Sequence, residues 1–155
     1  MLIREANPDD WSKVAALLAE LGRPDVRGAR EEEEARELFL SYLGRPDAVA
    51  LVAEDGGRVV GFLDMEYRVR LNFTTPQAWI PDLIVDEGAR GLGIGRALLE
   101  QAEKRAREQG CWSMSLESAA WRKRAHAFYL REGWNETGKS FSKVLSDVVW
   151  PPSPR

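Results

Sequence analysis

The feature that most constrains the fold is a glycine-rich loop between a strand pattern and a helix pattern, within Trp79–Gly110. The apolar run that ends at Val85 predicts a strand, and the spacing of apolar residues from Ile94 onward predicts a helix. Between them, three glycines stand at every second position: Gly91, Gly93 and Gly95. Such a loop directs backbone N–H groups and the positive end of a helix dipole toward one point, which favours binding of an anion such as phosphate.

The charges around this loop support an anion site. Arg90 and Arg96 lie in the loop and the first helical turn, where a helix dipole ordinarily favours acids, and the next acid is Glu100. The alternative is that the glycines only relieve steric crowding and the arginines are solvated. A dinucleotide-binding loop is disfavoured, because the spacing is G-x-G-x-G rather than G-x-G-x-x-G and no βαβ unit precedes it.

Composition limits the classes of partner. The chain has 155 residues, 44% hydrophobic and 30% charged, which is typical of one globular domain. The net charge of −3 disfavours nucleic acid, and no apolar run approaches the ~20 residues that span a bilayer. One cysteine and one histidine rule out an internal disulfide and disfavour a metal site. Since the N-terminus lacks the apolar region of a signal peptide, we expect a cytoplasmic protein that binds no nucleic acid, membrane or metal.

The remaining patterns predict the order β-α-α-β-β-β-α-β-α-β-β, which is an α/β (α+β) fold with a mixed, mostly antiparallel sheet of about seven strands. Strands are expected over residues 2–6, 48–54, 58–68, 77–85, 111–117, 134–137 and 141–149. Helices are expected over residues 8–21, 31–43, 93–109 and 121–131. We expect one domain over residues 1–149, followed by a proline-rich tail over 150–155.

Two stretches of the chain resemble a known family. The loop from Arg90 to Gly95 fits the pattern Arg/Gln-x-x-Gly-x-Gly/Ala and resembles the acetyl-CoA-binding motif of the GNAT N-acetyltransferase superfamily. The run from Ala125 to Trp134 is similar to the second signature of that family, and residues 139–145 are similar to its last strand. The order of elements also matches from residue 2 to about residue 149, so the resemblance implies the GNAT fold for nearly the whole chain.

The resemblance implies an acetyl-CoA-dependent N-acetyltransferase in which a primary amine attacks the thioester directly in a ternary complex. The strand before the loop would lie along the pantetheine arm, and successive N–H groups of the loop would hold the pyrophosphate. The implied cofactor-binding residues are Leu83, Ile84, Val85, Arg90, Gly91, Leu92, Gly93, Ile94, Gly95 and Arg96. Tyr129 would protonate the departing thiolate, since a tyrosine with a pKa near ~10 suits a thiol of similar acidity.

The group that takes the proton of the amine is less defined. Asp82, Glu66 and Glu117 are candidates, and we rank Asp82 first because it stands beside the strand that would contact the cofactor. Two positions depart from the family pattern. Pro81 stands where many members have a glutamate, and Arg122 stands where they often have an asparagine that contacts the cofactor.

The sequence contains no motif that identifies the acceptor. The residues around His126 resemble those of family members that modify small molecules and antibiotics, which favours a small amine or an antibiotic over a protein as the acceptor. The family also implies that a homodimer is possible. The alternative function is a non-catalytic acyl-CoA-binding sensor or interaction module. Tyr129 disfavours that alternative, because such a module needs no general acid.

Overall fold

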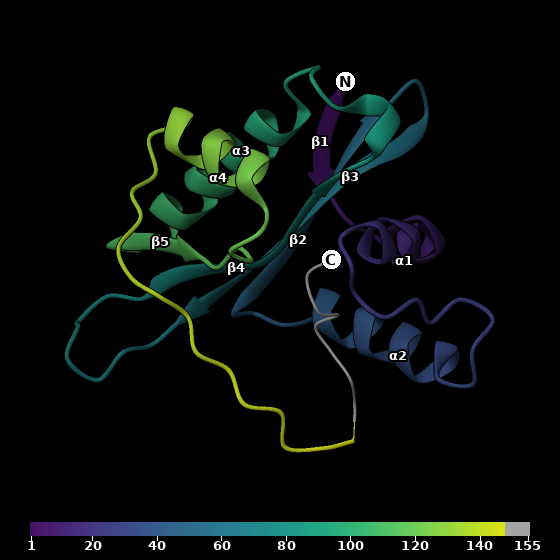
Figure 1. The fold of residues 1–155 in the computed structure, drawn as a ribbon, viewed down its shortest axis with the longest axis horizontal. Helices are drawn as coiled ribbons and strands as arrows, with labels where there is room; N and C mark the ends of the chain where they lie inside the picture. Colours follow the sequence, from purple (N-terminus) through teal and green to yellow (C-terminus); the bar gives the residue numbers. More distant parts are fainter. Residues whose placement is uncertain (148–155) are drawn as a thin grey trace.

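The computed structural model describes residues 1–147 and contains one five-stranded sheet in the order β1-β2-β3-β4-β5 (Figure 1). The first four strands pair antiparallel, and β4 pairs with β5 in parallel. The strands are β1 (Leu2–Glu5), β2 (Ala48–Asp55), β3 (Arg58–Arg68), β4 (Gln77–Val85) and β5 (Ser113–Leu116). The helices are α1 (Trp11–Glu20), α2 (Glu32–Leu43), α3 (Ile94–Glu108) and α4 (Lys123–Arg131), with short 3-10 turns η1 (Pro8–Asp10) and η2 (Glu87–Ala89).

The helices cover both faces of the sheet: α1 and α2 lie on one face, and α3 and α4 on the other (Figure 1). Each face has its own apolar core. Along β3, Leu63 and Met65 face the core beneath α3, whereas Phe62 faces the core beneath α1 and α2. This alternation follows from the two-residue period of a strand. Among the described residues, no helix is both long enough and apolar enough to cross a membrane.

The strands β4 and β5 separate part of the way along the sheet. Their pairing begins at Gln77 with Ser113 and ends at Ile80 with Leu116, whereas β4 continues to Val85. Over its second half, β4 therefore pairs only with β3 within the described part of the chain. Within residues 1–147, this divergence leaves the second half of β4 without a neighbouring strand on that edge, where a ligand can contact the backbone.

The mixed, mostly antiparallel α/β architecture is confirmed, but the prediction of about seven strands is wrong for the described residues. Residues 134–137 form no strand, and neither do residues 141–147 of the other expected strand. Both stretches are short of alternating apolar residues: Phe141, Val144 and Leu145 are spaced by three and then one, which is not the period of a strand. Residues 148 and 149 of that strand, and the predicted tail, lie outside the described residues.

Candidate active site

The glycine loop has the geometry that its sequence predicts. Gly91 and Gly93 have φ angles of +83° and +79°, which residues with a side chain rarely adopt. Gly93 is the N-cap of α3, where no side chain caps the helix and no acid lies in the first turn. The N–H groups at this end therefore have no competing side-chain acceptor, and the residues present suit the phosphates of a CoA thioester.

The two arginines of the loop are engaged by the protein itself. Nε of Arg90 donates to the carbonyl oxygen of Val85 at 3.4 Å. Nε of Arg96 lies 3.0 Å from a carboxylate oxygen of Glu100 and 3.5 Å from one of Glu132. The presence of Arg96 at this helix end is thus explained by two acids, so the argument for an anion site depends on the backbone rather than on its guanidinium.

The predicted cofactor-binding residues of β4 point to opposite faces. Leu83 and Val85 pack toward α3, whereas Ile84 is buried in the core beneath α1 and α2. Leu92 in the loop is exposed, whereas Ile94, the first residue of α3, is buried in the core between α3 and the sheet. Because these side chains do not converge, any shared contact of these residues with one ligand has to use the backbone.

A cleft opens where β4 and β5 separate. It is bounded by the loop after α1, by β4 and by the stretch that runs from the end of β5 into α4. Its lining includes residues 21–23, Ile80, Pro81, Leu83, residues 116–119, Trp121, Arg122 and Tyr129. Three elements that are distant in the sequence thus meet at one concave site, which is the usual form of a small-molecule site.

Tyr129 lies in the wall of this cleft. Its ring packs against Phe128 and Trp134, with centroid separations of 5.4 Å and 6.0 Å. Its hydroxyl group makes no hydrogen bond with another described residue and can donate to a ligand. Burial raises the pKa of Tyr129, and the charge of Arg122 opposes this only partly, so the hydroxyl keeps its proton at neutral pH.

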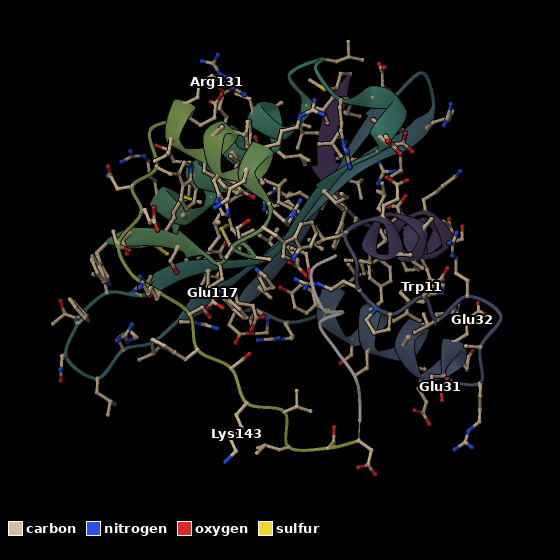
Figure 2. All side chains as sticks on the ribbon, in the orientation of Figure 1. Trp11, Glu31, Glu32, Glu117, Arg131 and Lys143 are labelled. Atoms are coloured by element: carbon tan, nitrogen blue, oxygen red, sulfur yellow. The ribbon has the colours of Figure 1, made fainter. Side chains whose placement is uncertain are left out.

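The three candidate acids are not equivalent. Glu117 lines the cleft and accepts a hydrogen bond from the Ser140 hydroxyl at 3.2 Å; Figure 2 shows it far from Glu31 and Glu32 at the start of α2. Asp82 does not line the cleft, and Nε of Arg23 contacts its Oδ1 at 2.7 Å.

Glu66 is paired with Arg45 at 3.0 Å, further along β3.

The tryptophans Trp79 and Trp121 differ in their position relative to the cleft. Trp121 lines the cleft. Trp79 does not; the guanidinium carbon Cζ of Arg68 lies over its ring, 3.4 Å from the ring centroid. The only histidine, His126, contacts the Ala119 carbonyl oxygen through Nε2 at 2.8 Å, which ties the segment before α4 to the helix.

A polar cluster that the sequence patterns do not predict lies behind the cleft. Arg23 stands in the turn after one predicted helix, and Tyr42 lies on the apolar face of another, so neither local pattern marks a polar site. In the structure, both lie with Asp64 around the middle of β4. Burial, followed by the negative charge of Asp82, raises the pKa of Asp64 well above the usual carboxyl range. The one indication in the sequence is the alternation within residues 58–68, which places Asp64 and Glu66 on one face of the predicted strand.

Comparison with known proteins agrees with this geometry. The family model described as the Acetyltransferase (GNAT) family matches residues 14–134. The aminoalkylphosphonate N-acetyltransferase of Salmonella typhimurium is 32% identical over 92% of this chain and 90% of its own length. An aminoglycoside N(6')-acetyltransferase type 1 of Stenotrophomonas maltophilia is 30% identical over 87% of this chain and 86% of its own.

Solved structures share the fold. A putative acetyltransferase from Agrobacterium tumefaciens superimposes with a TM-score of 0.80 at 26% identity, covering 92% of this chain and 100% of that one. A protein described as a transcriptional regulator from Bacillus halodurans gives a TM-score of 0.84 at 24% identity, covering 93% and 99%. The chain belongs to the GNAT acetyltransferase family. It is an acetyl-CoA-dependent N-acetyltransferase, which is the activity that the family signatures predicted.

Proposed function

We propose that this enzyme acetylates the primary amine of a small acceptor molecule, and that the reaction takes place in the cleft between β4, β5 and α4. The observation that carries the proposal is the position of Tyr129 in the wall of that cleft, opposite the unpaired edge of β4. A non-catalytic acyl-CoA-binding module is disfavoured, because such a module needs no proton donor at this place.

The donor half of the site is assigned to the loop and to β4. Backbone N–H groups from Gly91 to Arg96 hold the pyrophosphate of acetyl-CoA, supported by the uncapped N-terminus of α3. The backbone of Leu83, Ile84 and Val85 lies along the pantetheine arm. Pairing through the backbone suits these residues, because their side chains alternate between two faces of the sheet.

The protein has to provide three groups for the reaction: a hydrogen-bond donor for the oxyanion, a general acid and a general base. The neutral amine attacks the thioester carbonyl carbon, and the resulting oxyanion accepts a hydrogen bond from a backbone N–H of β4. The intermediate then expels the thiolate of CoA, which takes the hydroxyl proton of Tyr129. Asp82 does not line the cleft, so it receives the proton released by the attacking nitrogen through water. No covalent intermediate with the enzyme is required, so one acid and one base complete the set.

The names of the two relatives support a small acceptor: one acts on an aminoalkylphosphonate and the other on an aminoglycoside. The lining of the cleft carries charges of both signs: Arg23 comes from the loop after α1, and Glu117 and Arg122 come from the segment between β5 and α4. Mixed charge suits a small polar amine that presents both a cation and polar or anionic groups.

The test is release of free CoA thiol from acetyl-CoA in the presence of single amines. The panel contains an aminoalkylphosphonate, an aminoglycoside, a polyamine and a lysine-containing peptide. We expect turnover with at least one of the small amines and little with the peptide. If acetyl-CoA binds but none of the amines yields thiol, the acceptor proposal fails.

Gly93→Asp serves as the matched variant for the donor site. It places a side chain on a backbone with φ of +79° and a negative charge against the pyrophosphate. We expect it to abolish binding of acetyl-CoA, measured by isothermal titration calorimetry. Binding that survives this substitution would refute the assignment of the loop.

Three further expectations stay predictions: a single domain over residues 1–149, a cytoplasmic location and a homodimer. Sedimentation velocity of the purified chain measures the last of these. A monomer at micromolar concentration would remove the homodimer, without affecting the assignment of the cleft.

A further inference from the structure

We infer that Arg23 and Asp64 are positioning residues for acetyl transfer, because together they fix a bulge in β4 that forms one wall of the cleft. The inference rests on the proposed function for its effect on rate. The bulge itself, and the contacts that hold it, are independent of which amine is acetylated.

The bulge lies between two regular stretches of the β3–β4 ladder. Asp64 pairs with Asp82, but Glu66 already pairs with Trp79, so two residues of β4 face the single residue Met65 of β3. These two residues are 80 and 81, and the second is a proline, which has no N–H to donate. A bulge bends its strand and redirects the backbone, and an extra residue leaves polar groups without ladder partners.

Two side chains satisfy the backbone groups that the bulge displaces. The N–H of Asp82 donates to Oδ1 of Asp64 at 2.8 Å. Nη2 of Arg23 donates to the carbonyl oxygen of Pro81 at 3.0 Å, while its Nε donates to Oδ1 of Asp82 at 2.7 Å. One arginine thus holds both the backbone and the side chain of neighbouring residues, and one carboxyl group holds the adjacent N–H.

A third contact supports the opposite strand. The hydroxyl of Tyr42 on α2 donates to the carbonyl oxygen of Met65, the residue that faces the bulge, at 3.3 Å. Burial, and then the charge of Asp64, raises the pKa of Tyr42, so this hydroxyl stays a donor. The bulge is therefore held from the face of the sheet that lies opposite α3 and α4.

These contacts matter for the reaction because of what the bulge faces. Ile80 and Pro81 line the cleft together with Tyr129, and Arg23 belongs to the loop after α1 that lines it as well. Arg23 joins two walls of the cleft that are 59 residues apart in sequence. Loss of either contact leaves a displaced backbone group of β4 without its partner, so the backbone of the bulge can shift and change its distance from the general acid. A displacement of ~1 Å in a positioned group can cost ~10²-fold in rate.

The experiment compares four variants with the wild-type enzyme, using the small amine that gives the highest turnover. Arg23→Ala and Asp64→Ala each remove one contact. Asp64→Asn keeps an oxygen that accepts the N–H of Asp82. Arg4→Ala is the matched control, because it removes an arginine that contacts two acids, Asp10 and Glu54, away from the cleft. Thermal melting establishes the temperature at which each variant is folded.

We expect kcat to fall ~10- to 100-fold in Arg23→Ala and Asp64→Ala, with KM for acetyl-CoA within ~3-fold, because the pyrophosphate loop is untouched. Asp64→Asn should stay within ~3-fold of the wild-type kcat, since it keeps the acceptor oxygen. Arg4→Ala should lower the melting temperature and leave kcat unchanged. Wild-type kcat in both alanine variants would overturn the inference. So would an Asp64→Asn enzyme as slow as Asp64→Ala, because the carboxyl group would then act through its charge.

Hydrogen–deuterium exchange separates this inference from the proposed function. In the peptide that spans residues 78–84, we expect faster amide exchange in Arg23→Ala and Asp64→Ala, and wild-type exchange in Asp64→Asn and Arg4→Ala. If no amine is acetylated by the wild-type enzyme, the proposed function fails while exchange still tests the bulge contacts. Unchanged exchange in both alanine variants overturns the inference whatever the acceptor is.

Discussion

Replacement of Tyr129 by phenylalanine tests the chemistry most directly, because the structure separates its hydroxyl group from its ring. The ring packs between Phe128 and Trp134, and both contacts survive the substitution. The hydroxyl makes no hydrogen bond with another described residue, so its loss leaves no partner unsatisfied. We therefore expect the free energy of unfolding to change by less than ~0.5 kcal/mol. Turnover should fall by ~10²-fold, which corresponds to ~2.7 kcal/mol of transition-state stabilisation.

The pH dependence of the reaction rate provides a second test of Tyr129 as the general acid. Burial raises the pKa of Tyr129 above its usual value, so the protonated form that donates is retained to higher pH than for a free tyrosine. The wild-type rate should therefore show no loss of the general acid below a pH of ~10. The profile of Tyr129→Phe should have the same shape over this range at a lower level.

The assay is thiol release at saturating acetyl-CoA and amine, with urea unfolding of both proteins as the control for stability. A variant rate within ~3-fold of the wild-type rate would remove Tyr129 from the mechanism, since a general acid contributes at least ~10²-fold. A basic limb that falls below pH ~10 in the wild-type profile and disappears in the variant would refute the direction of the pKa shift.

Two further predictions concern stability. A Cβ added at Gly61 would lie 3.0 Å from Cδ1 of Leu98 and 3.1 Å from Cγ2 of Ile94. Gly61→Ala should therefore displace α3 and lower the free energy of unfolding, measured by urea titration, by ~1–3 kcal/mol. An unchanged urea midpoint would mean that α3 moves to accommodate the methyl group without a cost in stability. Burial raises the pKa of Asp10, but its hydrogen bonds with Arg4 and with the N–H of Asn7, together with the charge of Arg4, outweigh burial and lower the pKa overall. A carboxyl group with a lowered folded pKa stabilises the fold above its unfolded pKa of ~3.9, and this contribution is lost as pH falls through the folded value. Asp10→Asn should therefore cost ~1–3 kcal/mol at pH 7 and progressively less below pH ~4, and a cost that does not depend on pH would contradict this account.

Most of what the sequence predicted correctly depends on neighbours in the chain. A glycine pair between two strand patterns predicts a hairpin, and Gly56 and Gly57 do join β2 and β3 with the positive φ that such a turn requires. An asparagine before a proline predicts a helix cap, and Asn7 caps the first helical turn by accepting from the N–H of Asp9. The glycine loop belongs to the same class, since its conformation is set by its own residues.

The errors and omissions involve partners that are distant in the sequence. Arg96 is an indication of an anion site in the sequence, but Glu132, which directly follows α4, is one of its partners. Arg23 and Asp82 are 59 residues apart, and nothing in either local pattern indicates that they meet. Two closing strands were expected over residues 134–137 and 141–149, but β5 offers them an edge of only four residues. Pairing of a strand requires a partner of adequate length as well as a suitable sequence.

The three glycines of the loop, which first pointed to a phosphate site, have different structural reasons. Gly91 and Gly93 supply the left-handed conformation that turns the chain into α3. Gly95 has no such conformation; a Cβ there would lie 3.3 Å from Cζ of Phe128, so its small size allows α4 to approach the first turn of α3. Tyr129 follows Phe128 in the chain. The third glycine therefore sets how closely the helix that carries the general acid packs against the loop that binds the donor. The two family signatures, which are separate in the sequence, thus form one structural unit whose spacing depends on the absence of a single methyl group.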